Sequence, residues 1–291
     1  MLSPFLKSML SGYDESCYRI APSDFQEILR ANGAMEETGR LDLSLPAASE
    51  ISTRRVSLAI KAAAIQIPYD GMVVDLCCGT GYIARSLLAM QKVGSVIGID
   101  LSGGQLNLLK RVVDKDAKMR GKLSVLQADT LRLPFADNCI DLIIGNSFLH
   151  HLPDVGVALT EIGRVIKPGG QFVVLHEPSL TATFFESFPW SLFKNIRIEN
   201  YTDLWQFDPG DLRRLLEQAG FTEIKILKTG VFANTLFGAF SIVINKFWPR
   251  WDKAKLLLEH LKGSLSAFEY RFSLTKAPSL LIQATWPRTA A

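Results

Sequence analysis

Residues 73–82 read VVDLCCGTGY, in which a short apolar run containing one acidic residue leads into two closely spaced glycines. The run predicts a buried strand. Gly79 and Gly81 predict a tight turn, where the backbone can approach a ligand without interference from a Cβ atom. Nineteen residues after Gly81, Asp100 closes a second β-branched run. A carboxylate in that position can accept hydrogen bonds from both hydroxyls of a ribose. These features predict a cofactor site at the ends of two neighbouring strands.

Around this turn, strand and helix patterns alternate from residue 70 to residue 228. Ser102, Asp154 and Asp208 are typical helix starts, and Pro168-Gly169-Gly170 predicts a break before a strand. Predicted strands cover 72–77, 95–101, 123–127, 140–145, 171–176, 221–227 and 279–285, and predicted helices cover about 47–66, 82–90, 102–117, 154–167 and 208–220. Continuous apolar strands that alternate with helices indicate an α/β fold, with a seven-stranded, mostly parallel sheet and helices on both faces.

Composition excludes several classes of protein. The chain has 291 residues, 48% of them apolar and 21% charged, which excludes a disordered protein. Its net charge of +3 lacks the basic excess of a nucleic-acid-binding protein. Four cysteines do not form a disulfide framework in so long a chain, and no His/Cys cluster has metal-ligand spacing, so no metal is predicted. With no apolar run of about 20 residues and no secretory signal, the predicted location is cytoplasmic.

The glycines alone are compatible with two classes of cofactor. Residues 79–84 read GTGYIA, which also satisfies the G-x-G-x-x-G/A pattern of dinucleotide-binding proteins. The acidic residue four positions before Gly79 separates the two classes. Asp75 is unfavourable beside a pyrophosphate, but it suits a ligand that carries a cationic amino group.

With these motifs, residues 68–228 resemble the class I S-adenosylmethionine-dependent methyltransferases, in the branch that contains the ubiquinone and menaquinone methyltransferases. Residues 75–81 are similar to the family motif D-x-G-x-G-x-G, with Cys77 in place of its first glycine. The segments QADT at 127–130, LPFAD at 133–137, NSFLHHLP at 146–153 and RVIKPGG at 164–170 follow in the family's order. The resemblance implies a Rossmann-like fold and methyl transfer from S-adenosylmethionine. The flanking segments do not match the quinone enzymes, so the acceptor is not implied.

The resemblance also implies a set of cofactor-binding residues. The glycine loop would hold the methionine end of the cofactor, Asp100 the ribose and Asp129 with Thr130 the adenine. Leu101 would pack against the purine, and Asn146 would stand at the edge of the methyl site. Tyr13 and Tyr18 resemble an N-terminal segment that closes over the cofactor. The complete predicted set is Asp75, Cys77, Gly79, Thr80, Gly81, Asp100, Leu101, Gln105, Asp129, Thr130, Asn146, Tyr13 and Tyr18.

Catalysis of a direct displacement depends mainly on positioning and on exclusion of water. A general base helps only when the acceptor loses a proton. His151 is the first candidate for that base and His150 the second, although such a pair can equally serve to structure its loop. Glu177, just after the fifth predicted strand, either faces the acceptor or acts as a solvated or capping residue.

The flanks complete the predicted organisation. Residues 1–69 form an N-terminal helical lid, and residues 70–291 form the methyltransferase domain, with cap inserts at about 178–207 and 229–278. Aromatic residues are frequent in both inserts, which predicts an apolar pocket for a bulky aromatic, isoprenoid, lipid or secondary-metabolite acceptor. The basic segment Lys246–Lys262 is either a solvated helix face or a peripheral membrane contact. The oligomeric state is not predicted.

Two other functions fit parts of the sequence. A catalytically silent S-adenosylmethionine-binding partner subunit would keep Asp75, Gly79, Gly81 and Asp100. An NAD-dependent oxidoreductase would keep the glycines, but Asp75 and the downstream motifs disfavour it.

Overall fold

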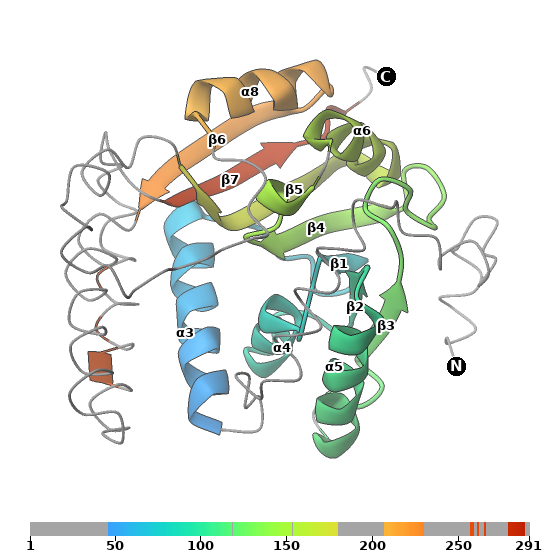
Figure 1. The fold of residues 1–291 in the computed structure, drawn as a ribbon, viewed down its shortest axis with the longest axis vertical. Coiled ribbons are helices and arrows are strands. Elements are labelled where there is room, and N and C mark those ends of the chain that lie inside the picture. The colour runs from blue at the N-terminus through green and yellow to red at the C-terminus, as the bar shows by residue number, and fades with distance from the viewer. Residues whose placement is uncertain are drawn as a thin grey trace, which may run out of the picture.

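A computed structural model describes residues 46–117, 119–152, 154–179, 207–229, 257–258, 261, 265 and 279–288. Within them, one seven-stranded sheet has the order β3-β2-β1-β4-β5-β7-β6 (Figure 1). Its strands are β1 (Val73–Leu76), β2 (Val96–Asp100), β3 (Leu123–Gln127), β4 (Ile140–Asn146), β5 (Ile166–Pro178), β6 (Thr222–Thr229) and β7 (Ser279–Thr285). Strands β1 to β5 pair in parallel, and β7 is antiparallel to both β5 and β6. The predicted α/β class and the mostly parallel sheet are confirmed.

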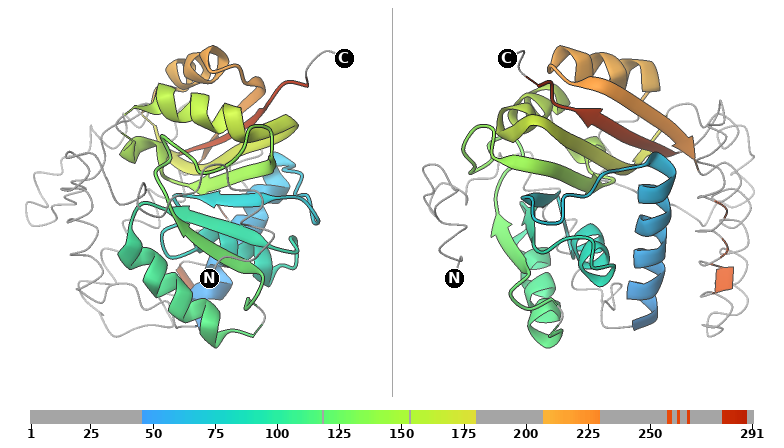
Figure 2. Two further views of the ribbon diagram at one scale, coloured as in Figure 1. Left: turned by 90° about the vertical axis from the view of Figure 1, so that its right-hand side faces the viewer. Right: turned by 180° about the vertical axis from the view of Figure 1, so that it is seen from behind.

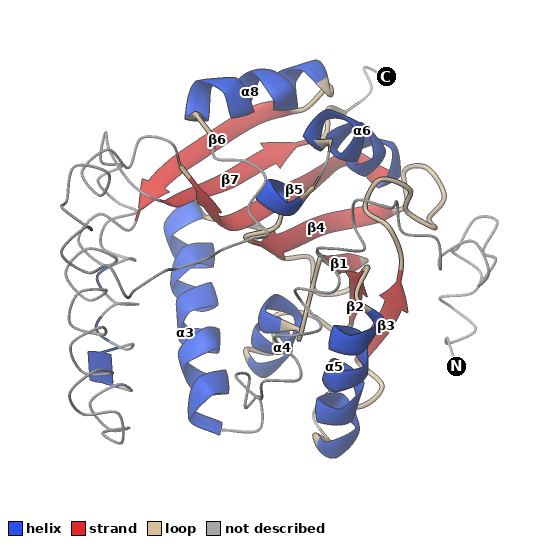
Figure 3. Ribbon diagram, in the orientation of Figure 1, coloured by secondary structure: helices blue, strands red, loops and turns tan. Residues whose placement is uncertain are grey.

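Helices cover both faces of this sheet. Figures 1 and 3 show α3, α4 and α5 on one face, with α6 and α8 on the other. Two separate groups of buried side chains, one under each layer, agree with this arrangement. The helices are α3 (Pro46–Ala63), α4 (Tyr82–Ala89), α5 (Gly103–Lys115), α6 (Val155–Val165) and α8 (Pro209–Gln218).

The predicted helix starts follow from side-chain caps. Asp154 accepts a hydrogen bond from the Val157 N–H at 2.9 Å. Asp208 accepts one from the Gly210 N–H at 2.7 Å, and proline occupies the first helical position after it. Ser102 caps α5 in the same way, as its pairing with the Gln105 N–H shows. These caps satisfy backbone donors that have no partner inside the helix.

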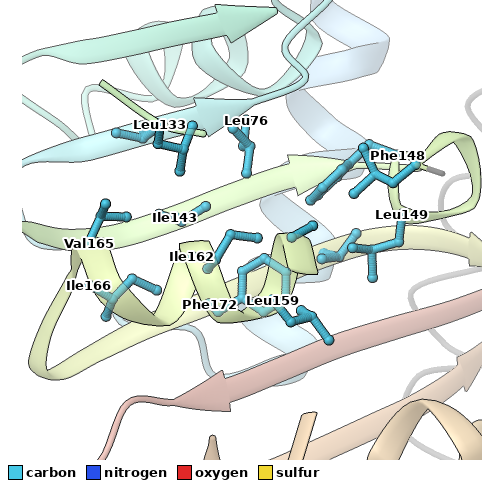
Figure 4. Packing of buried hydrophobic residues seen from close by; sticks show 14 of the residues in the cluster. Leu76, Leu133, Ile143, Phe148, Leu149, Leu159, Ile162, Val165, Ile166 and Phe172 are labelled. Atoms are coloured by element: carbon cyan, nitrogen blue, oxygen red, sulfur yellow. The ribbon is translucent and has the colours of Figure 1, made fainter. Parts of the chain in front are cut away.

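The core fixes the carboxyl ends of the strands in place. Helix α6 packs on β4 and β5, and Figure 4 shows its Leu159 and Ile162 beside Ile143 and Phe172. All of these side chains are fully buried. On the opposite face, the buried residues of α3 and α4 belong to a second cluster that also contains parts of β1, β4 and β5. The loops of the candidate site therefore extend from a sheet that is packed on both sides.

One element begins earlier than predicted. The fifth strand starts at Ile166 rather than at Gln171, because Ile166 pairs with Ile140 of the adjacent strand β4. Gly169, at φ 82°, lets the chain bend between Ile166 and Gln171, and the register shifts there. Pro168-Gly169-Gly170 is therefore an irregularity inside β5. The prediction that the strand begins only after these three residues was wrong.

Several predictions lie wholly or mostly outside the described residues. They include the lid segment with Tyr13 and Tyr18, the two cap inserts and most of Lys246–Lys262. Within the described part of the chain, no helix is long and apolar enough to cross a membrane. Figure 2 shows the described layers from two further sides, with α3 standing beside α4 on the same face of the sheet.

Candidate functional site

The loop after β1 is the most constrained part of the site. Cys77, Gly79 and Gly81 all have left-handed backbones, with φ of 52°, 53° and 81°. A Cβ atom on Gly81 would lie 2.6 Å from a methyl carbon of Leu109 in α5, so only glycine fits there. The Cys78 N–H donates to the carbonyl of Ile99 in β2 at 2.8 Å. The loop is therefore tied to the neighbouring strand, while Thr80 lies between its two glycines.

Asp100 braces this loop from the end of β2. One of its carboxylate oxygens accepts the Gly79 N–H at 2.8 Å, and the other accepts the Ser102 N–H at the same distance. These two backbone N–H groups occupy two of the about four acceptor positions of a carboxylate. Sequence reasoning missed the contact to Gly79, because it arises only when the ends of β1 and β2 are side by side, whereas the contact to Ser102 is local, two residues along the chain.

Gln105 covers the glycine loop from α5. A Cβ atom on Gly79 would lie 2.6 Å from the Gln105 Oε1 atom, so the amide group lies directly against the loop. Leu101, next to Asp100, accepts a hydrogen bond on its carbonyl from Gln127 Nε2 at 2.9 Å. This contact joins the ends of β2 and β3 at the same edge of the sheet.

Asp75 is the buried acidic residue of the motif. Its side chain is 1% exposed, and it accepts the Ala84 N–H of α4 at 2.8 Å. Burial raises its pKa to about 8 against the lowering effect of the Ala84 N–H, and the nearby Asp100 carboxylate adds to the rise. Asp75 therefore holds a proton at neutral pH unless a cation reaches it.

A second loop, after β3, meets the glycine loop at Cys77. The Cys77 Sγ atom lies 3.2 Å from the Thr130 Oγ1 atom. Thr130 is 5% exposed. Burial, followed by the Asp100 carboxylate, raises the pKa of Cys77, so this side chain is a thiol at neutral pH. Asp129 accepts the Leu131 N–H at 2.9 Å, which shapes the turn that carries Thr130.

Asn146 ends β4 with an unsatisfied acceptor. Its Oδ1 atom is buried and has no hydrogen-bond partner within the described part of the chain. Such an atom in a native site is accounted for by an unseen donor. Immediately before it, a Cβ atom on Gly145 would lie 2.7 Å from both the Leu76 carbonyl and the Phe148 ring. Ser147, immediately after it, has a left-handed backbone at φ 54° that no sequence signal predicted.

His150 and His151 lie on a short 3-10 turn, η2 (Leu149–His151), after β4. Their rings are in contact, with centroids 3.8 Å apart and planes tilted by 49°. His150 is 4% exposed, and its Nδ1 atom lies 2.8 Å from a carboxylate oxygen of Glu177. His151 is the more exposed of the two rings. Glu177 is completely buried, which sets it apart from a solvated residue.

The described residues of the predicted site thus lie at one edge of the sheet, in the last residues of β1, β2, β4 and β5, in the segments that follow β1 to β4, and in the first turn of α5. Parallel strands bring these ends together, and backbone hydrogen bonds join adjacent loops: Cys78 to Ile99, Ala128 to Asp100 and Ser147 to Leu175. Tyr13 and Tyr18 lie outside the described residues. Ligand contacts by the other predicted residues remain predictions.

Comparison with known proteins points to one chemistry. A family model described as a methyltransferase domain matches residues 74–174. Demethylmenaquinone methyltransferase of Staphylococcus aureus is 34% identical over 169 residues, which cover 53% of this chain and 68% of that protein.

Solved structures show the same fold. A Haloferax volcanii chain, solved in a complex with the Trm112 methyltransferase activator, is 22% identical with a TM-score of 0.51, over 83% of this chain and 95% of that one. Phosphoethanolamine N-methyltransferase 2 of Haemonchus contortus, solved with S-adenosyl-L-methionine, is 18% identical with a TM-score of 0.52, over 79% of this chain and 52% of that one. At these identities the likeness concerns the fold alone.

Proposed function

Because this chain belongs to the class I S-adenosylmethionine-dependent methyltransferases, its cofactor is S-adenosylmethionine, and we propose that the acceptor of the methyl group is a bulky, largely apolar small molecule. The observation that carries the acceptor proposal is the relation to a quinone methyltransferase, extending over two thirds of that relative. The aromatic residues of the segments 178–207 and 229–278 support the same class of acceptor. A lipid contact through residues 246–262 would suit an acceptor that partitions into membranes.

The residues at the strand ends fit this cofactor. Gly79 has a left-handed backbone at φ 53°, a conformation that favours glycine and leaves the backbone free of a Cβ atom where the loop would face the ligand. Asp100 lies at the carboxyl end of β2, beside the glycine loop, where we place the ribose of the cofactor. The buried Oδ1 atom of Asn146 can accept a hydrogen bond from a ligand N–H or O–H group. We assign these three residues to cofactor positioning, together with Asp75, Cys77, Thr80, Gly81, Leu101, Gln105, Asp129 and Thr130.

The protein contributes mainly orientation and exclusion of water. When bound, the sulfonium group of the cofactor supplies an activated methyl group. Asp100 joins the glycine loop to β2, because one of its oxygens accepts the Gly79 N–H while the other is held by the Ser102 N–H. The two histidines, His150 and His151, with their rings in contact, lie after β4, at the same edge of the sheet as this loop. We assign His151 as the general base if the acceptor loses a proton. For any other acceptor, we assign His151 a role in the structure of its loop.

Replacement of Asp100 by asparagine tests the cofactor site. We expect Asp100→Asn to weaken S-adenosylmethionine binding by tenfold or more, because a charged hydrogen bond contributes about 1.5–3 kcal/mol. Isothermal titration calorimetry measures the affinity. Asp141→Asn is the matched control, since Asp141 also accepts a backbone N–H, that of Met72 at 2.8 Å, but near the amino end of β4. Equal affinities of wild type and Asp100→Asn would contradict the assignment.

The same titrations separate the alternative functions. Tight binding of NAD with no response to S-adenosylmethionine would indicate an oxidoreductase and overturn the proposal. Normal cofactor binding without methylation of any acceptor would indicate a silent partner subunit.

The acceptor class is tested with methyl-labelled S-adenosylmethionine. A short-chain demethylmenaquinol is the apolar probe, and a small hydrophilic amine is the comparison acceptor. We expect label to enter the organic-extractable product. Label transferred only to the amine would contradict the proposed acceptor class while leaving the cofactor assignment intact.

A further inference from the structure

Glu177 occupies an unusual position at the end of β5. Its side chain is 0% exposed, although the residue lies at the edge of the sheet that carries the candidate site. The pairing of β5 with β7 shifts register between Val174 and Glu177, and His176 in this interval has a left-handed backbone at φ 63°. Left-handed backbone at a non-glycine residue is unfavourable and is retained where the surrounding structure requires it. A strained irregularity of the strand thus accompanies the inward placement of this carboxyl group.

The Glu177 carboxylate accepts hydrogen bonds from three consecutive backbone N–H groups of the neighbouring loop. Its Oε1 atom accepts the N–H groups of Phe148 at 2.6 Å and Leu149 at 2.8 Å. Its Oε2 atom accepts the His150 N–H at 3.3 Å and lies 2.8 Å from His150 Nδ1. These are the initial N–H groups of η2, which have no partner inside such a turn. The side chain therefore joins β5 to the turn that follows β4.

These contacts favour one position for the ring hydrogen of His150. A carboxylate that receives three backbone N–H groups acts as an acceptor only, so the hydrogen in the fourth contact belongs to His150 Nδ1. A hydrogen on Nδ1 fixes the tautomer of a neutral imidazole and the orientation of its ring. The His151 ring contacts this oriented ring at 3.8 Å between centroids, with a tilt of 49° between the two planes.

We propose that Glu177 is a positioning residue, which holds the η2 turn and keeps the hydrogen of His150 on Nδ1, and so orients the His150–His151 pair for methyl transfer. The inference rests on the proposed function of this site. It replaces the sequence-based alternative in which Glu177 faces the acceptor, because the carboxylate is completely buried and each of its oxygens already has two contacts. Glu177 acts on the reaction through the two histidines.

The substitution Glu177→Gln separates this role from simple capping. The glutamine oxygen can keep the contacts to Phe148 and Leu149, so the turn retains two of its donors. Its amide nitrogen, facing His150, can only donate, which moves the ring hydrogen from Nδ1 to Nε2. Long-range ¹H–¹⁵N correlation spectra of histidine-labelled protein report the tautomer directly, and the chain has only four histidines to assign.

A matched control is available in α6. Glu161 also accepts a backbone N–H, that of Leu133 at 2.7 Å, and also bonds a second side chain, Arg164. It lies outside the loops of the site. Glu161→Gln therefore tests what the loss of a comparable capping carboxylate does to the fold alone.

We expect wild-type His150 to carry its hydrogen on Nδ1 and the Glu177→Gln variant to carry it on Nε2. We expect the variant to lose about 10- to 100-fold in kcat with the demethylmenaquinol probe, while KM and the S-adenosylmethionine Kd change by less than about threefold. Glu161→Gln should keep the tautomer and kcat.

The outcomes against the inference are distinct from failure of the proposed function. An Nε2 hydrogen on wild-type His150 overturns the inference even if the variant does not fold. An unchanged tautomer in Glu177→Gln, or an unchanged kcat with a reversed tautomer, also overturns it. Absence of turnover by the wild type with every acceptor tested counts against the acceptor proposal, whereas the tautomer measurement is unaffected.

Discussion

Burial raises the pKa of Asp75 to about 8, so the ligand-free protein carries a proton there at neutral pH. A cationic amino group bound beside Asp75 would favour the ionised carboxyl. We therefore expect binding of S-adenosylhomocysteine between pH 6 and 7 to release a proton, and affinity to rise with pH by up to about tenfold per pH unit. Calorimetry in two buffers of different ionisation enthalpy measures the release.

Asp75→Asn is the control, and it should show no proton release. Equal binding heats for the wild type in the two buffers would contradict the assignment of Asp75 to the amino group. The same carboxyl affects stability. The free energy of unfolding of the ligand-free protein should fall as pH rises from about 4 to about 8, because the folded chain keeps a proton that the unfolded chain loses.

At the residue scale, the sequence predicted which polar residues lie at the strand ends, but it did not predict the long-range contacts of single residues. The motif placed Asp75, Gly79 and Asp100 at the ends of strands, because residue type and spacing carry that information. Capping was one of the alternatives predicted for Glu177, but the residues that it caps lie about 28 positions away in the sequence, and the contact of Cys77 with Thr130 spans 53 positions. A local pattern does not contain such contacts.

At the scale of single elements, α6 holds the segment that leads into β4. Arg164 donates hydrogen bonds to the carbonyls of Leu133 at 3.1 Å and Phe135 at 2.8 Å, and it pairs with Asp137 and Glu161. We expect Arg164→Ala to lower the free energy of unfolding by about 2 kcal/mol, because two carbonyls and two carboxylates lose their donor.

Urea unfolding monitored by circular dichroism gives this difference as a shift of the midpoint. Arg164→Lys should not restore stability, because an ammonium group lacks the forked geometry that reaches both carbonyls. A loss below about 0.5 kcal/mol in Arg164→Ala would show that solvent replaces these contacts without cost.

Elements were predictable where their signals were local. The caps at Ser102, Asp154 and Asp208 correctly marked helix starts, since the capping side chain lies within three residues of its donor. The start of β5 was misplaced because pairing of Ile166 with Ile140 is set by the adjacent strand. The predictions for segments outside the described residues, including the cap inserts, stay predictions.

At the scale of the whole molecule, the last strand in sequence lies inside the sheet. β7 pairs with β5 on one side and with β6 on the other, and its Leu280, Leu281 and Ile282 are 0% exposed. We expect a chain that ends at residue 278 to lack cooperative unfolding, because both neighbouring strands lose their partner.

A chain that ends at Arg288 is the control for this truncation, since it retains the two backbone hydrogen bonds that join Trp286 to Gly169 and Gly170. Thermal unfolding monitored by circular dichroism distinguishes the two chains. A cooperative transition in the shorter chain would show that β1 to β5 fold without β7. Sequence patterns identified this strand but not its place, because strand order is a property of the assembled sheet.

The internal position of β7 has a consequence for biosynthesis. During translation, β5 and β6 leave the ribosome well before residues 279–285 are made. Neither strand has β7 as its neighbour at that time. An unpaired strand edge can associate with other chains. We therefore expect the nascent protein to depend on holding chaperones until its final strand emerges, and to complete its sheet only after synthesis has reached that point.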